Sequence, residues 1–363
     1  MQKSGGVSSF FRHPGLPGGN DSQAEGFYDI QDGWTAYILA GGTSGMKTAL
    51  LRQIGEALEA AGEPVEMAVN ALDDESLDGL RAPGVRTCVL DGLRFGGYMP
   101  ACPGIGERVV GLDDALDIEK LAPYRARVLI FHARQLAAED RAERFLAAAG
   151  NLLTDNTRLA LECVDLQKMD TSAARLAHRL FPQVHRQGQE SVRLLTAVTA
   201  DGMQSFCAQT AEQFSNVYIL EDEYGVGTLF LSRLRDAALK AGQDVISCPC
   251  PLFRRDRPEH LLLPGVSTAF FTSCRFHPVE GYRHIHIRRF LDNAAIAKGR
   301  ARASFNRKAA RELIKQASLL LAEARENRRT VEELYSAAIR PNVLDALAEH
   351  IAADTLGRAG YRA

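Results

Sequence analysis

The sequence predicts an α/β protein made of two tandem domains, each a three-layer α/β/α core followed by a helical hairpin. Three observations lead to this prediction. Short apolar runs alternate with segments of helical periodicity, and the second half of the chain repeats the order of the first. A long helical stretch also follows each repeat. We place the boundary near Gly188, which gives domains 1–188 and 189–363.

The composition is that of an ordinary globular protein. Of the 363 residues, 46% are hydrophobic and 24% are charged, and this length suffices for two domains with full cores. The formal net charge of -2 argues against a general nucleic-acid-binding or membrane-surface protein. The seven cysteines lack the spacing of a disulfide framework, and no apolar run has the length of a signal peptide core or a membrane span. We therefore expect a cytoplasmic protein without membrane contact.

The segment 37–51 contains the strongest functional motif of the chain. An apolar run leads into a glycine-rich turn, and a Lys-Thr pair then opens an amphipathic helical pattern. This order is typical of a phosphate-binding loop, in which backbone N–H groups surround an anion, a lysine reaches the outer phosphates and a hydroxyl binds Mg²⁺. Counted from Gly41, Lys47 and Thr48 match the pattern G-x-x-x-x-G-K-[ST], but Met46 replaces the glycine before the lysine.

These residues predict a site for ATP or GTP with Mg²⁺. Lys47, an exposed residue of the first helical turn, would contact the β and γ phosphates, and Thr48 would bind the metal ion. Asp91 ends the apolar run 85–91 and would hold the same ion through water. Lys47 and Asp91 are thus the candidate catalytic residues, and Thr48 and Asp91 the candidate metal ligands. The backbone around the phosphates would come from Gly41, Gly42, Thr43, Ser44, Gly45, Met46, Lys47 and Thr48.

Two features argue against efficient hydrolysis at this site. The side chain of Met46 crowds the point where the backbone approaches the phosphates, and a positive φ angle there would add strain that glycine avoids. Asp91 is followed by Gly92, and the candidates for a water-orienting group, Glu75 and Asp78, lie in an acidic loop that a solvated surface explains equally well. We expect slow turnover or none.

The second half repeats the first at a constant offset in the sequence. Tyr37 matches Tyr218, and the pairs Pro83-Gly84 and Arg94-Phe95 match Pro264-Gly265 and Arg275-Phe276 at the same separation. One offset across strand, turn and strand indicates an internal duplication.

The loop of the second copy has lost the residues that bind phosphate. Thr228 and Leu229 stand in place of the lysine and the hydroxyl residue, and Thr272 replaces the acid at the strand end. The carboxylates of residues 221–223 would repel an incoming phosphate. We expect a scaffold-like copy without a nucleotide.

The chain resembles a family of uncharacterised bacterial proteins built from tandem P-loop ATPase-like halves. The resemblance covers nearly the whole chain and implies a P-loop NTPase fold and a nucleotide site for each intact half. Family members carry a G-x-P-G-T-G-K-S/T loop in both halves, from which this chain departs at Met46 and throughout the second loop. The segments that resemble the family are 18–20, 26–28, 41–48, 76–79, 90–92 and 103–104.

Three functions remain open at this point. The first is a nucleotide-binding P-loop protein with weak ATPase activity, whose second half is a scaffold. The second is a non-catalytic interaction module that has lost nucleotide binding. The third is a small-molecule kinase, which would need an acceptor pocket. The oligomeric state is unknown.

Two further groups of residues invite a functional interpretation. The basic segment Lys298–Lys315 is the best candidate for contact with nucleic acid or another anionic partner, although a solvated helix face is the commoner meaning. Ordinary strand and loop positions explain the cysteines and histidines better than a metal site, because they lack the C-x-x-C spacing of a zinc knuckle. These residues are Cys248, Cys250, Cys274, His277, His284 and His286.

Overall fold

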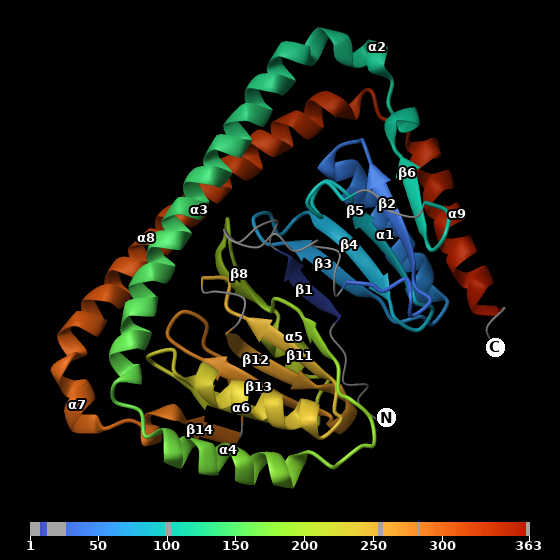
Figure 1. Ribbon diagram of the computed structural model, residues 1–363. Helices are drawn as coiled ribbons and strands as arrows, with labels where there is room; N and C mark the ends of the chain where they lie inside the picture. Colours follow the sequence, from blue (N-terminus) through green and yellow to red (C-terminus); the bar gives the residue numbers. More distant parts are fainter. Residues whose placement is uncertain are drawn as a thin grey trace. The chain divides into compact units, whose positions relative to one another are not determined.

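The computed structural model describes residues 8–12, 27–98, 100, 103–252, 257–281 and 283–360. It shows an α/β protein with two six-stranded mixed sheets, in which most neighbouring strands are parallel, and with long helices (Figure 1). The predicted α/β class is confirmed at this level. Residues 18–20 and 26, which contribute to the family resemblance, lie outside the described part of the chain. None of the described helices has the length and apolarity needed to cross a lipid bilayer.

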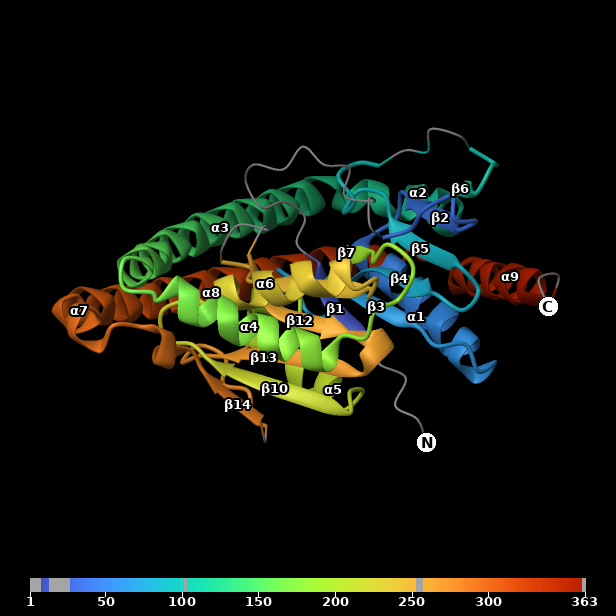
Figure 2. The same cartoon turned by 60° about the horizontal axis from the view of Figure 1, so that its bottom comes forward.

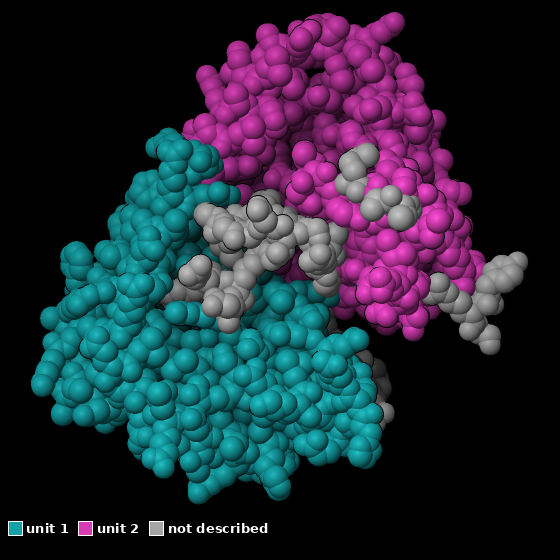
Figure 3. Space-filling model, in the orientation of Figure 1, with its two compact units in different colours: residues 1–7, 140–320 teal, residues 8–139, 321–363 magenta. Residues whose placement is uncertain are grey.

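The chain divides into two compact units, which Figure 3 distinguishes by colour. The first-sheet unit contains residues 8–139 and 321–363, and the second-sheet unit contains residues 140–320. The predicted boundary near Gly188 therefore differs from these units, because it falls inside the second-sheet unit. The physical reason is the length of α3 (Arg125–Leu161) and α8 (Arg300–Ser336), which have 37 residues each and contribute to both units. A straight helix of this length spans about 55 Å.

The first sheet brings the motif residues together at the carboxyl ends of two neighbouring parallel strands. Its strands, in spatial order, are β1 (Ser9–Arg12), β3 (Glu66–Asn70), β4 (Leu77–Ala82), β5 (Thr87–Asp91), β2 (Thr35–Ala40) and β6 (Glu107–Gly111). Strand β4 is antiparallel to both neighbours, whereas β2 is parallel to β5 and β6. Leu39 pairs with Asp91, so the loop after β2 begins beside the acid that ends β5.

The second sheet has the same strand order as the first. It runs β7 (Glu190–Val192), β11 (Val245–Pro249), β12 (Pro258–Leu263), β13 (Thr268–Ser273), β10 (Asn216–Glu221) and β14 (Arg283–His286). Leu220 pairs with Thr272 as Leu39 pairs with Asp91, and both partners are displaced by the offset of the sequence repeat. Arg86 and Ser267, separated by the same offset, both have positive φ angles, 49° and 44°. The repeat read from the sequence is therefore also a repeat of topology and backbone conformation.

Each sheet is covered by a helix from the other half of the sequence. In the first-sheet unit, α9 (Pro341–Gly360) packs against α1 (Ser44–Ala60). In the second-sheet unit, α4 (Leu166–Leu180) lies beside α6 (Gly227–Lys240), as Figure 2 shows. The buried face of α4 carries Met169, Ala173 and Ala177, spaced one helical turn apart.

Two β-bridges mark this exchange of helices. Leu116 pairs with Ile339 in the first-sheet unit, and Val164 pairs with Leu291 in the second-sheet unit. The number of residues from Leu116 to Leu291 equals the number from Val164 to Ile339. The two bridges therefore join corresponding positions of the two copies. A hairpin that returned to its own core would join Leu116 to Val164 instead. The helices of each predicted hairpin thus follow one another in the sequence. The last helix of each hairpin, however, belongs to the unit that contains the other sheet.

Smaller elements complete the fold. Strands β8 (Thr196–Thr199) and β9 (Gly202–Ser205) form a separate antiparallel pair in the second-sheet unit. The short helices are α2 (Ile118–Leu121), α5 (Cys207–Ala211) and α7 (Asn293–Lys298), with the 3-10 turns η1 (Asp113–Ala115), η2 (Ala122–Tyr124), η3 (Pro264–Val266) and η4 (Ile287–Phe290).

Candidate functional site

The loop between β2 and α1 is shorter than the motif predicts. Helix α1 begins at Ser44, which leaves residues 41–43 as the connection. Gly41 and Gly42 have φ angles of 72° and 65°, a conformation that favours glycine. The Met46 N–H donates to Thr43 Oγ1 at 3.2 Å, and the Lys47 N–H donates to the Thr43 carbonyl at 3.1 Å. These two N–H groups, which the prediction assigns to phosphate, are used to cap and begin the helix.

A carboxylate from α8 lies on the N-terminus of α1. The Gly45 N–H donates to Glu332 Oε1 at 2.8 Å, and Thr43 Oγ1 donates to Glu332 Oε2 at 2.5 Å. A Cβ atom at Gly45 would lie 2.6 Å from Glu332 Oε2, so a larger residue there would displace the carboxylate from this position. The N-terminus of a helix carries a partial positive charge and free N–H groups, which attract anions. In this structure the N-terminus of α1 is therefore occupied by a carboxylate of the protein itself.

Lys47 and Asp91 form a buried ion pair. Lys47 Nζ lies 2.7 Å from Asp91 Oδ1, and the two side chains are 5% and 4% exposed. Asp91 Oδ1 also accepts a hydrogen bond from the Leu93 N–H at 3.0 Å. The sequence correctly predicts that the two residues lie together, but the expectation of an exposed Lys47 is wrong. The ammonium group is directed to a strand end rather than to solvent.

Thr48 and Met46 are also part of the protein interior. Thr48 Oγ1 accepts a hydrogen bond from the Leu77 N–H at 3.0 Å, which ties α1 to β4. Met46 is 1% exposed and packs in the core. Because Asp91 Oδ1 and Thr48 Oγ1 both have protein partners, this arrangement does not fit a bound Mg²⁺ ion. Within the described residues, no group of three or more His, Cys, Asp or Glu side chains is placed to hold a metal ion.

The acidic loop beside α1 is held by arginines of α8. Arg328 Nε lies 2.6 Å from Asp73 Oδ2, and Arg328 Nη2 lies 2.9 Å from Glu75 Oε2. Arg329 also pairs with Glu75, and its hydrogen bond lowers the pKa of that carboxyl group. Glu75 is therefore neutralised by its neighbours rather than free to orient water.

Asp78 is not a loop residue. It lies in β4, is 1% exposed, and accepts a hydrogen bond from Asn70 Nδ2 at 2.9 Å. Its placement in a solvated acidic loop is thus wrong, because β4 begins at Leu77 and carries the chain into the sheet. Burial raises the pKa of Asp78 from 3.8 to about 6.

This raised pKa predicts a pH-dependent effect of Asp78→Asn. Between about pH 4 and pH 6 the folded chain holds a proton that the unfolded chain has released, so the free energy of unfolding falls as pH rises. The substitution removes this loss and should stabilise the first-sheet unit by about 2–3 kcal/mol at pH 7, with little change at pH 4. Urea unfolding followed by the fluorescence of Trp34, the single tryptophan, measures both values. A stability difference that is the same at both pH values would contradict the assignment.

The second loop is closed by its own aspartate. Asp222 accepts hydrogen bonds from the N–H groups of Tyr224 and Gly225, each at 3.0 Å, and of Gly227 at 2.6 Å. Burial raises the pKa of Asp222, and the backbone donors of the loop oppose this shift. The anion position at the start of α6 is thus filled by a residue of the loop itself.

His277 and Cys250 lie beside Glu259, an acid that the sequence did not suggest, whereas His284 and His286 pair with Glu221. His277 Nε2 lies 2.8 Å from Glu259 Oε1, and Thr196 Oγ1 donates to Glu259 Oε2 at 3.1 Å. Burial by itself would raise the pKa of Glu259, but the pairing with His277 lowers it to about 2. Burial would likewise lower the pKa of His277, but Glu259 raises it to about 11. The two form a buried ion pair of the second-sheet unit.

The basic segment of α8 is partly neutralised. Arg302 pairs with Asp155 of α3, and Arg307 Nη2 lies 3.4 Å from Glu223 Oε1. The Arg307 side chain is only 11% exposed. Part of this segment therefore stabilises the fold, and its contact with an anionic partner stays a prediction.

Comparisons with protein-family models, with curated proteins and with solved structures gave no match. The functional proposals below therefore rest on the geometry of these residues.

Proposed function

We propose that the N-terminus of α1 binds the phosphates of a nucleotide, ATP or GTP, and that Glu332 occupies this position when the nucleotide is absent. The observation that supports the proposal most is the Glu332 carboxylate on Gly45 N and Thr43 Oγ1, at 2.8 and 2.5 Å. A phosphate oxygen is the same kind of acceptor for these donors. The carboxyl ends of parallel strands such as β2 and β5 are also where open α/β sheets commonly bind ligands.

The surrounding residues favour binding over hydrolysis. Asp91 Oδ1 accepts from both Lys47 and a backbone N–H, and Glu75 is paired with arginines. Asp78 is buried in β4. A water-orienting group would have to leave one of these partners before it could act on a γ phosphate, so slow turnover or none remains the expectation.

The test is to weaken the interaction of Glu332 with the N-terminus of α1, because Glu332 competes with the nucleotide for this position. Glu332→Gln keeps the shape of the side chain but removes its charge, and a charged acceptor makes the stronger hydrogen bond. The variant should bind ATP about tenfold more tightly than the parent protein in isothermal titration. Glu333→Gln is the matched control, since Glu333 is the exposed neighbour on the same helix and should leave the affinity unchanged.

A second candidate function is a non-catalytic interaction module without a nucleotide. The observation that favours it is the use of Met46, Lys47 and Thr48 as interior residues of the first-sheet unit. Under this alternative, Glu332→Gln binds ATP and GTP no more tightly than the parent protein does in the titration. That result would remove the nucleotide proposal and retain the module.

A further inference from the structure

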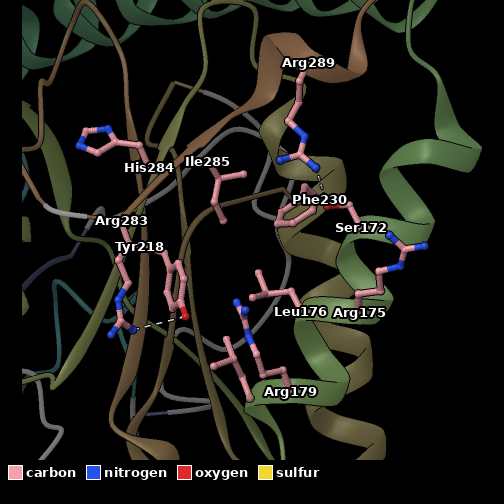
Figure 4. A pocket seen from close by; sticks show the side chains of 11 residues that line it. Ser172, Arg175, Leu176, Arg179, Tyr218, Phe230, Arg283, His284, Ile285 and Arg289 are labelled. Carbon is pink, nitrogen blue, oxygen red and sulfur yellow. Dashed lines mark hydrogen bonds between the residues drawn. The ribbon is translucent and has the colours of Figure 1, made fainter.

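The second-sheet unit contains a hollow rimmed by arginines. Figure 4 shows it between α4 and the strands β10 and β14, with α6 behind. Its volume is about 690 Å³, within the usual range of small-molecule sites. Arg175 and Arg179 come from α4, Arg283 from β14, and Arg289 from η4. Strand β14 is the edge strand of the second sheet, and α4 contacts η4.

The hollow has an excess of positive charge. None of the eleven described residues that line it is an aspartate or a glutamate. In the part of the chain that the structure describes, none of the four arginines forms an ion pair with a carboxylate. Of these described lining residues, only His284 has an acidic partner, with Nδ1 2.7 Å from Glu221 Oε1. Several cations held together without counter-charges create a local field that attracts an anion.

Neutral partners hold two of the arginines in place. Arg283 Nη1 donates to Asn216 Oδ1 at 2.7 Å and to the Tyr218 hydroxyl at 3.4 Å. Arg289 Nη2 donates to Ser172 Oγ at 3.4 Å. Figure 4 shows both of the bonds made within the hollow, and it shows Arg179 extending from α4 toward Tyr218. These bonds use only part of each guanidinium, which has five donors.

Most of the remaining lining of the hollow is apolar, apart from Ser172 and His284. Leu176 and Ile285 are partly exposed there, and Tyr218 and Phe230 form the buried base. A site made only for inorganic phosphate has no use for such a surface. Arginines around an apolar wall instead suit a ligand that has a phosphate at one end and an apolar or aromatic body at the other.

We propose that this hollow binds an organic phosphate of nucleotide size. Its phosphate groups lie against arginines of the rim, Arg179 and Arg283 near Tyr218 and Arg289 beside Ser172, because planar guanidinium groups match phosphate oxygens in pairs. Its apolar body lies against Leu176 and Ile285. The site contains no glycine-rich loop and belongs to the second-sheet unit, so it does not depend on the proposed function of α1.

The test is isothermal titration of the full-length protein with ADP in EDTA, so that metal ions do not contribute to the measured affinity. Arg179→Gln/Arg289→Gln should weaken ADP binding by about tenfold or more. Arg288→Gln should not, because Arg288 is exposed beside Arg289 but does not line the hollow. Glu332→Gln should also leave this affinity unchanged, which separates the hollow from α1.

Two further ligands test which kind of anion the hollow binds. Pyrophosphate should bind more weakly than ADP, because it lacks the body that contacts the apolar wall, and equal affinities would overturn the assignment to an organic phosphate. A short single-stranded RNA that binds through Arg179 and Arg289 while ADP does not would also overturn it. The same holds if Arg288→Gln and Arg289→Gln weaken ADP binding equally, since the effect would then be one of overall charge.

Discussion

Replacing Lys47 with methionine is expected to destabilise the first-sheet unit by about 3–5 kcal/mol. The substitution leaves the Asp91 carboxylate, 4% exposed, without the ammonium group that lies 2.7 Å from it. A buried charge without a partner costs far more than the net value of the pair. Urea unfolding followed by Trp34 fluorescence measures the loss, because the single tryptophan lies in this unit.

A double variant separates the ion pair from a general packing effect. Lys47→Met/Asp91→Leu removes both charges and should recover most of the lost stability, since an apolar pair of similar volume can replace a buried ion pair. Lys120→Met is the control, because the Lys120 side chain is 60% exposed. A Lys47→Met protein within about 0.5 kcal/mol of the parent would show that the pair contributes little to stability. Loss of nucleotide binding in a Lys47 variant therefore indicates a direct contact with the nucleotide only if the variant is shown to be folded.

A fragment of residues 1–188 is expected not to form a stable first-sheet unit. It lacks α9, whose Arg358 Nη1 donates to Thr35 Oγ1 at 2.6 Å and whose Asp345 accepts from Gln53 Nε2 at 2.8 Å. It also lacks Glu332 and the arginines that hold the acidic loop. Without these contacts the apolar surface of α1 that α9 covers is exposed to water. We expect no cooperative urea transition of Trp34 and low solubility.

The matched comparison is a chain that joins residues 8–139 to residues 321–363 through a flexible linker. It contains the whole first-sheet unit and should unfold in a cooperative transition. If the 1–188 fragment unfolds as cooperatively as this chain, then the first-sheet unit does not need α9, and the exchange of helices contributes little to its free energy of unfolding.

The sequence by itself determined the repeat and several of its strands, but not β4, whose first residues it assigns to a loop. Apolar runs at Tyr37 and Tyr218 became β2 and β10, and the offset between these two tyrosines reappears in the pairing of Leu39 with Asp91 and of Leu220 with Thr272. The sequence also placed Lys47 near Asp91. Such features depend on local periodicity and on the rule that the ends of neighbouring parallel strands meet at one edge, and both can be read from short segments.

The tertiary structure alone decided which helix covers which sheet and which groups meet at the site. The buried residues of α4 and α9 recur at helical spacing, which shows that each helix has a buried face but not which copy of a repeated core it packs against. Glu332 reaches Gly45 although the two residues are distant in the sequence, and Asp78 is buried because β4 begins just before it, at Leu77. Arg179 and Arg289 face one hollow although they belong to different halves of the chain. The contacts of Glu332 and of the two arginines depend on the folded path of the long helices α3 and α8, which no local pattern encodes.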